Sequence, residues 1–306
     1  MEQADSVLIA GGTGMVGERL TNILIQNGYK VMLLSRRKHS NGNIPVYHWD
    51  TDDNSIDENA ILRADHIINL SGENIAAERW TKERKKQLIE SRTKSAALLF
   101  DTCQRLQCFP KTYISASAIG YYGDRGSEIL DEESSEGGGF LAECCIAWEA
   151  GIQKWIESGA RTITYRIGLV LSTKGGVMAE TIKPLRFGLA TFFGSGKQYN
   201  SWIHIDDLCG LFQLAIEDEE MSGIFNAVSP NPVSNFEFTR SLAKAWRKPY
   251  LLLPVPSFVL QLMLGESAAM ILGSSIVSSA KAEQHGFVFQ FPDLSIAFTD
   301  LIQRGK

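Results

Sequence analysis

A glycine cluster between an apolar run and an amphipathic run constrains this chain more than any other feature. Val7–Ala10 leads directly into Gly11–Gly17, and apolar residues then recur at helical spacing as far as Gly28. Strand, glycine turn and helix in this order predict a dinucleotide-binding turn, in which glycine permits close approach to a pyrophosphate. The helix N-terminus would offer free N–H groups to that anion. We expect cofactor contacts from Gly11, Thr13, Gly14, Met15, Val16 and Gly17.

The end of the second predicted strand indicates which dinucleotide is bound. The strand over 30–35 ends in Ser35-Arg36-Arg37, and no acidic residue is present there. A NAD site usually has Asp or Glu at this position for the ribose 2′-hydroxyl, whereas arginine accommodates a 2′-phosphate through charge-assisted hydrogen bonds. A solvated basic turn is the alternative interpretation. Together with the glycine turn, the pattern favours NADP (as NADPH) over NAD.

Composition argues against several classes of function. Of the 306 residues, 44% are hydrophobic and 21% are charged, and the net charge of −5 gives no general attraction to nucleic acid or to an anionic membrane. The most apolar stretch, 258–277, is interrupted by polar residues, so no membrane span is expected. The five cysteines have no CxxC pair and no metal-ligand spacing with histidine. We therefore expect reduced thiols in a cytoplasmic protein without a metal site.

Strand and helix signals alternate through the first half of the chain. This alternation predicts an α/β fold with a Rossmann-type, doubly wound parallel sheet. Ligands of such sheets bind beyond the carboxyl ends of the strands. Small and polar residues follow several predicted strands, and we expect further cofactor contacts from Leu70, Ser71, Gly72, Glu73, Ser115, Arg166 and Gly168.

The regular alternation loosens after residue 171. We expect a nucleotide-binding domain over 1–171 and a smaller C-terminal substrate lobe formed by 172–199 and 231–306. Residues 200–230 are expected to return and pack on the first domain.

Local patterns also predict the bounds of individual helices. Thr81 is the predicted N-cap of a long helix that extends to residue 106. We expect one helix over 140–158, another over 178–189, and a third whose N-terminus is capped by Asp206-Asp207.

Several motifs resemble extended short-chain dehydrogenase/reductases of the epimerase/dehydratase type: the glycine turn, the strand end Ser115–Ser117, and Trp202–Asp207. Matching motifs at 69–75, 79–81, 90–92 and 115–123 narrow the resemblance to an atypical "epimerase family" subgroup. Its members end in a small domain of unassigned function, which residues 254–301 resemble. The resemblance covers essentially the whole chain. It implies an NADP-binding Rossmann protein, and for most members the reaction is unassigned.

The chain departs from the ordinary pattern at the catalytic pair. In ordinary members a Tyr-x-x-x-Lys on the helix after the serine strand handles the proton, and the lysine lowers the tyrosine pKa. The resemblance places Leu141 at the tyrosine position and Cys145 at the lysine position. Leucine transfers no proton, and a neutral thiol supplies no positive charge. Arg92 stands where an Asn usually assists the proton relay, and we expect it beside the cofactor.

The first hypothesis is a reductase or epimerase in which other residues handle the proton. Ser117 would keep the contact with a substrate hydroxyl, and Tyr121 or Tyr122, Glu73 or Cys145 would act as the acid or base. Each has a structural alternative: the cysteine as a small buried hydrophobe, the tyrosines as packing beside the cofactor, the glutamate as a cap or ribose ligand. The retained serine and a full substrate lobe favour this hypothesis.

The second hypothesis is an NADP-binding sensor or scaffold without hydride chemistry, acting through a protein partner. The missing Tyr-Lys pair favours it, and some relatives are loosely associated with division. A third, nucleic-acid binding through the basic run 82–86, is disfavoured by the acidic net charge. The chain is expected to be a monomer or a homodimer, since the resemblance implies possible pairing through the helices at 81–106 and 140–158, as ordinary members often do.

Overall fold

The computed structural model describes residues 4–37 and 42–305. Its centre is an eight-stranded sheet with the strand order β13-β8-β6-β5-β1-β2-β3-β4. All neighbouring strands pair in parallel except β3 and β4, which are antiparallel. The strands are β1 (Ser6–Ala10), β2 (Lys30–Ser35), β3 (Val46–Asp50), β4 (Ser55–Ile56), β5 (His66–Asn69), β6 (Thr112–Ala118), β8 (Arg161–Ile167) and β13 (Gly223–Ala227). The predicted α/β, doubly wound Rossmann-type fold is confirmed.

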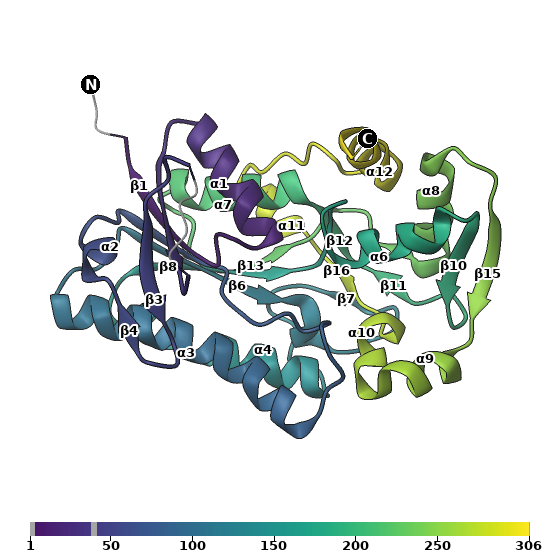
Figure 1. Cartoon of the computed structure of the whole chain (residues 1–306), viewed down its shortest axis with the longest axis horizontal. Helices are drawn as coiled ribbons and strands as arrows, with labels where there is room; N and C mark the ends of the chain where they lie inside the picture. Colours follow the sequence, from purple (N-terminus) through teal and green to yellow (C-terminus); the bar gives the residue numbers. More distant parts are fainter. Residues whose placement is uncertain (1–3, 38–41, 306) are drawn as a thin grey trace.

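Helices cover both faces of this sheet (Figure 1). One face carries α1 (Met15–Gln26) and α7 (Ile205–Glu217), and the other carries α2 (Glu58–Leu62), α3 (Lys82–Leu106), α4 (Phe140–Ala150) and α5 (Gln153–Glu157). Along β1, Val7 and Ile9 belong to the core under α1 and α7, whereas Leu8 and Ala10 belong to the core under α3 and α5. Both faces are buried, which explains why the strand is a continuous apolar run.

The remaining elements lie mostly at the end of the molecule away from β2–β4 (Figure 1). They are η1 (Ile119–Tyr122), β7 (Ile129–Leu130), β9 (Leu169–Leu171), α6 (Gly176–Leu185), β10 (Leu189–Phe193), β11 (Tyr199–Asn200), β12 (Trp202–His204), β14 (Val233–Ser234), α8 (Asn235–Trp246), β15 (Leu251–Val255), α9 (Ser257–Leu264), η2 (Gly265–Ala268), α10 (Ala269–Leu272), β16 (Ile276–Val277), α11 (Ala280–Gln284) and α12 (Leu294–Arg304). β10 pairs with β15, and α8 packs against α12.

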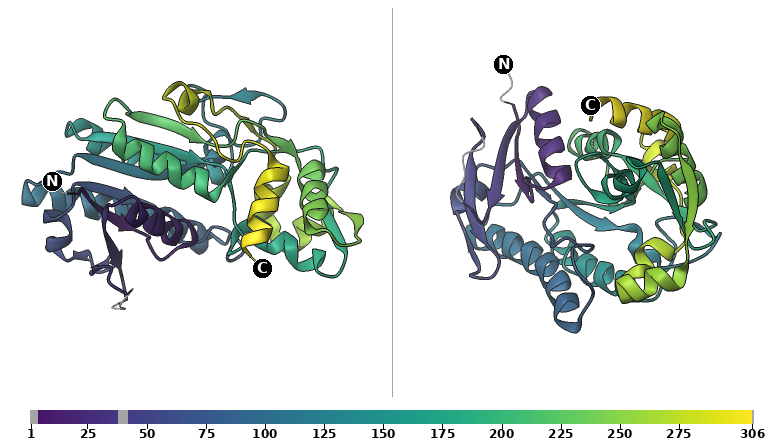
Figure 2. Two further views of the ribbon diagram at one scale, coloured as in Figure 1. Left: turned by 90° about the horizontal axis from the view of Figure 1, so that it is seen from above. Right: turned by 45° about the vertical axis from the view of Figure 1, so that its right-hand side comes forward.

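Two segments from the second half of the chain return to the first half. β12 pairs in parallel with β9, and β13 becomes the edge strand of the large sheet by pairing with β8. The C-terminal helix α12 packs beside α8, and both views in Figure 2 show the two helices next to each other. None of the helices in the described ranges has the length and apolarity needed to cross a membrane.

Three local predictions need correction. The segment 140–158 is two helices, α4 and α5, separated by a break at Gly151-Ile152. The segment 178–189 is helical only as far as Leu185, because Pro184 weakens the last turn and Gly188 turns the chain with a φ of +78°. The strand β10 then starts at Leu189.

The third correction concerns the N-terminus of α7. Its N-cap is His204, whose side chain accepts a hydrogen bond from the Asp206 backbone N–H, and the two aspartates lie in the first turn instead. By contrast, Thr81 caps α3 as predicted, because its side chain accepts from the Arg84 backbone N–H.

Candidate functional site

The glycine turn after β1 leaves no room for side chains at two of its positions. A Cβ on Gly11, whose φ is +82°, would lie 2.8 Å from the Leu70 carbonyl, and one on Gly17 would lie 2.4 Å from the Gly11 carbonyl oxygen. Gly14 closes the turn with a 3.1 Å hydrogen bond to the Gly11 oxygen and is the N-cap of α1. No side chain caps this helix, so its first turn presents backbone N–H groups and the positive dipole end outward.

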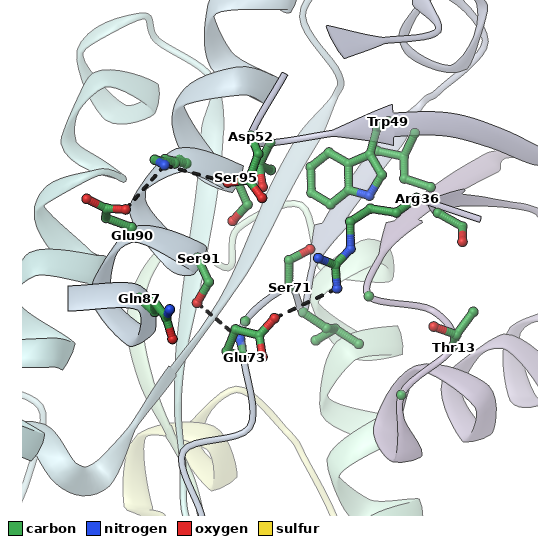
Figure 3. A pocket seen from close by; sticks show the side chains of 18 of the residues that line it. Thr13, Arg36, Trp49, Asp52, Ser71, Glu73, Gln87, Glu90, Ser91 and Ser95 are labelled. Carbon is green, nitrogen blue, oxygen red and sulfur yellow. Dashed lines mark hydrogen bonds and ion pairs between the residues drawn. The ribbon is translucent and has the colours of Figure 1, made fainter. Parts of the chain in front are cut away.

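A cavity of about 1300 Å³ lies beside this turn, at the carboxyl ends of β1, β2 and β5 (Figure 3). Ten of the residues predicted to contact a cofactor line it: Gly11, Thr13, Gly14, Ser35, Arg36, Arg37, Leu70, Ser71, Gly72 and Glu73. The residues Met15, Val16, Gly17, Arg92, Ser115, Arg166 and Gly168 are not part of its lining, nor are Ser117, Tyr121 and Cys145. Of the candidate catalytic residues, only Glu73 faces this space.

The cavity has a charged edge suited to a phosphate. The Ser35 hydroxyl accepts a 3.2 Å hydrogen bond from the Arg37 N–H and shapes the turn after β2. The Arg36 side chain is 63% exposed, so its guanidinium is accessible to a ligand. The Ser71 hydroxyl also lines the cavity, and its oxygen is buried without a hydrogen-bond partner among the described residues. The cavity therefore fits a 2′-phosphorylated dinucleotide. The glycine turn and the N-terminus of α1 suit its pyrophosphate, and the two arginines suit its 2′-phosphate.

Sequence reasoning missed a second wall of this cavity. The residues concerned are Leu34, Trp49, Thr51 and Asp52 on β2, β3 and the following turn, and Arg84, Gln87, Glu90, Ser91, Lys94 and Ser95 on α3. Arg84, Gln87, Ser91 and Ser95 recur at intervals of three or four and therefore form one polar stripe along the helix. That spacing is a signal in the sequence, although the basic run 82–86, which includes Arg84, was considered only for nucleic-acid binding.

A buried polar network lies at the carboxyl end of β6. Ser117 and Arg166 are register partners on β6 and β8, and both are 2% exposed. The Ser117 hydroxyl donates a 2.7 Å hydrogen bond to the Glu149 carboxylate on α4. Arg166 holds both oxygens of that carboxylate, through Nε at 2.9 Å and Nη2 at 2.8 Å. This fork of two parallel bonds fixes the orientation of the carboxylate.

The two tyrosines of η1 belong to the same network. The Arg166 guanidinium lies over the Tyr121 ring, 3.4 Å from its centroid, and donates to the Tyr122 hydroxyl at 3.1 Å. The Tyr122 hydroxyl in turn donates to Asn226 Oδ1 at 2.7 Å. Burial raises the pKa of both phenols above the ordinary value of tyrosine. Arg166, predicted as a cofactor ligand, thus has its side chain bonded to the protein.

The helix that would carry Tyr-x-x-x-Lys packs tightly on η1. A Cβ on Gly120 would lie 3.1 Å from Leu141 Cβ and 3.6 Å from Cys145 Sγ, so a side chain there would crowd α4. Cys145 is 4% exposed, and burial raises the pKa of its thiol to about 12. The thiol is therefore protonated near neutral pH.

Arg92 on α3 is hydrogen-bonded to the loop after β5. Its Nη1 donates to the Leu88 carbonyl at 2.8 Å, and its Nη2 donates to the Glu73 carbonyl at 3.1 Å. The guanidinium lies 4.9 Å from the Trp148 ring centroid, and burial lowers its pKa. The side chain therefore contacts the loop that lines the cavity.

The described residues contain no cluster of three or more His, Cys, Asp or Glu side chains arranged to hold a metal ion. All five cysteines are free thiols.

The histidine before α7 is fully buried, stacks on Phe291 at 3.8 Å between ring centroids, and has its pKa lowered by burial. His204 therefore has a structural role as a neutral helix cap.

Residues 7–227 match the NAD dependent epimerase/dehydratase family. The chain belongs to this family. Residues 255–301 match a Domain of unknown function (DUF1731), in agreement with the predicted C-terminal domain. The extended short-chain dehydrogenase/reductase resemblance is thus confirmed.

Relatives within the epimerase family cover nearly the whole chain. An epimerase family protein of Mycobacterium bovis is 35% identical over 285 residues, which are 92% of this chain and 93% of that protein. The mouse epimerase family protein SDR39U1 is 33% identical over 300 residues, 97% of this chain and 99% of that protein. The crystal structure of human epimerase family protein SDR39U1 (isoform 2) with NADPH superposes with a TM-score of 0.87 at 29% identity, covering 97% of this chain and 99% of that one.

Proposed function

We propose that this epimerase-family chain is an NADP(H)-dependent oxidoreductase or epimerase acting on a small carbonyl or hydroxyl compound. One observation above all supports NADP(H) as the cofactor. The end of β2, which lines the cavity beside the glycine turn, carries Arg36 and Arg37 and no acidic residue. The human relative crystallised with NADPH supports the same cofactor. The chain binds NADP(H) in this cavity.

NADP, when bound, exchanges a hydride with the substrate carbon, so the chain must move the accompanying proton. We propose that Ser117 accepts the proton of a substrate hydroxyl while passing its own to Glu149, to which it already donates at 2.7 Å. The reverse transfer serves the reduction of a carbonyl. Arg166 holds the carboxylate in place for either direction.

The other candidate acids and bases, Cys145, Tyr121 and Glu73, are less suited to proton transfer. Cys145 is a poor base near neutral pH because burial raises the pKa of its thiol to about 12. The pKa of Tyr121 is also raised, chiefly by burial. Glu73 lines the cofactor cavity and is bracketed by arginines, which favours a role in cofactor binding over proton transfer.

We also propose that residues 172–199 and 231–306 form the substrate lobe on a nucleotide-binding domain over 1–171. A small cavity supports this division, because Leu169 after β8 lines it together with Phe193, Asn235 and Met270 from later segments. The protein is proposed to be cytoplasmic and to act as a monomer or homodimer.

The second candidate function is a catalytically silent NADP(H) sensor that acts through a protein partner. Two observations favour it: Ser117 is 2% exposed, and Leu141 and Cys145 replace the usual proton-transfer pair.

Transfer of deuterium distinguishes the two functions. Purified protein is incubated with NADPH labelled at either face of nicotinamide C4 and a panel of aldehydes, ketones and sugar-like carbonyl compounds, and products are analysed by mass spectrometry. The oxidoreductase predicts loss of label from one face only, and predicts that Ser117→Ala and Glu149→Gln reduce it. NADPH binding without label loss across the panel would favour the sensor.

A further inference from the structure

The Glu73 carboxylate lies between two guanidinium groups at the wall of the nucleotide cavity. Its Oε1 is 3.8 Å from Arg36 Nη2, and its Oε2 is 3.6 Å from Arg84 Nη2. Figure 3 shows the first of these ion pairs crossing the cavity from the loop after β5 to the end of β2. Arg36 is thus paired with a carboxylate of the protein at the position where a 2′-phosphate is expected.

The backbone of Glu73 is held on both sides, so only its side chain is free to move. The Glu73 N–H donates to the Ser91 hydroxyl at 3.1 Å, and the Glu73 carbonyl accepts from Arg92 Nη2 at 3.1 Å. The side chain itself is 40% exposed. A rotation about its own bonds can therefore carry the carboxylate from one arginine toward the other without moving the loop.

Arg84 lies near two carboxylates, those of Glu73 and Glu78, but at distances longer than a hydrogen bond. The residue is 8% exposed, and its Nη2 donates to the Asn74 carbonyl at 3.0 Å. Its Nε is buried without a hydrogen-bond partner within the described ranges; Glu78 Oε2 lies 3.9 Å away, beyond hydrogen-bond distance. A buried cation with an unpaired N–H gains free energy when a carboxylate approaches.

We propose that Glu73 is a specificity-determining residue that leaves Arg36 for Arg84 when a 2′-phosphorylated nucleotide binds. A phosphate on Arg36 repels the carboxylate, and Arg84 receives it. Arg84 then raises the affinity for NADPH by acting through Glu73. NADH has no 2′-phosphate and leaves the Arg36–Glu73 pair intact. This inference rests on the proposed binding of NADP(H) in the cavity, although it requires no substrate and no hydride transfer.

A double-mutant cycle tests the proposal. The Kd values of NADPH and NADH are measured by nucleotide fluorescence titration for the wild type, Glu73→Gln, Arg84→Met and the double variant. The matched control is Glu78→Gln, which removes a carboxylate near the same arginine but outside the cavity lining. Thermal unfolding of each variant without nucleotide checks that it is folded.

The proposal predicts a distinct pattern for NADPH. Glu73→Gln tightens NADPH by about three- to fivefold, because the carboxylate no longer competes for Arg36. Arg84→Met weakens NADPH by a similar factor in the wild-type background and has no effect in the Glu73→Gln background. The NADH affinity stays within about twofold in every variant, and Glu78→Gln changes neither affinity.

Three results would overturn the proposal. Equal effects of Glu73→Gln on NADPH and NADH would mean that Glu73 contacts a part common to both nucleotides. An equal loss from Arg84→Met in both backgrounds would mean that Arg84 binds the phosphate directly. A tightening by Glu78→Gln would indicate a general effect of net charge. If the wild type bound neither nucleotide, the cofactor assignment itself would fail, which separates that failure from these three.

Discussion

Ser117 and Glu149 are joined by a 2.7 Å hydrogen bond in which the serine hydroxyl is the donor. The Glu149 side chain is 13% exposed and is also held by the buried Arg166. In ordinary family members the corresponding serine contacts the substrate. In this chain the Ser117 hydroxyl already donates to a carboxylate of the protein. In the proposed function this pair forms the proton path in place of the tyrosine and lysine.

Removing that carboxylate should affect stability as well as activity. Glu149→Gln leaves Arg166 buried without its counter-charge, and we expect a loss of about 3 kcal/mol in the free energy of unfolding. Ser117→Ala keeps the ion pair and should cost about 1 kcal/mol. Urea unfolding measures both, with Glu180→Gln as a control because its ion pair with Lys183 is exposed. If Glu149→Gln, Ser117→Ala and Glu180→Gln were equally stable, a structural role for the buried Arg166–Glu149 ion pair would be contradicted.

The arginine at the end of β2 should determine cofactor preference. Arg36→Ala is expected to weaken NADPH about 10- to 100-fold, because a charge-assisted contact with the 2′-phosphate is lost, and to leave NADH nearly unchanged. Titration of both nucleotides measures the effect. Arg186→Ala is the control, since Arg186 is exposed and does not line the cavity. A parallel loss of both affinities would contradict phosphate recognition.

The glycine turn should tolerate no side chain at Gly17, its last glycine. Gly17→Ala places a Cβ 2.4 Å from the Gly11 carbonyl oxygen and 2.6 Å from the Gly12 Cα, so backbone must move. We expect a loss of about 1–3 kcal/mol in stability and a loss of NADPH binding. Gly138→Ala, where a Cβ meets no atom within 4 Å, should change neither quantity. Normal NADPH affinity in Gly17→Ala would show that the turn is not the pyrophosphate site.

Acid should destabilise the chain through His204. Burial lowers the pKa of this histidine from 6.5 to about 4, so the folded state binds the proton less well than the unfolded state. Its contribution to stability is complete above pH 6.5 and falls as the pH decreases toward 4, by about 2 kcal/mol at pH 5. His204→Asn retains a side-chain oxygen that can cap α7 but cannot take up this proton. Urea unfolding at pH 7 and pH 5 should give a smaller difference for the variant; an identical difference would rule out His204 as the source.

The sequence by itself determined the fold class and predicted the cofactor end of the site. Both depend on patterns that are local in the chain: an apolar run, the spacing Gly11–Gly14–Gly17, and the arginines that follow the next strand. Parallel strands bring their carboxyl ends to one edge, so residues at several strand ends could be assigned to one site without knowledge of side-chain positions. The cap at Thr81 was predictable for the same reason, because its partner Arg84 is three residues away.

Only the tertiary structure decided how the polar groups are paired. Glu149, Ser117 and Arg166 come from a helix and two strands, and no pattern within one segment indicates their contact. The interpretation of Arg166 as a cofactor ligand could not anticipate a carboxylate on α4 that binds it first. Likewise, Arg84 belongs to the basic run 82–86, and local sequence does not show that the loop after β5 covers it. Burial and pairing depend on contacts between distant segments, and these determine which charged groups remain available to a ligand.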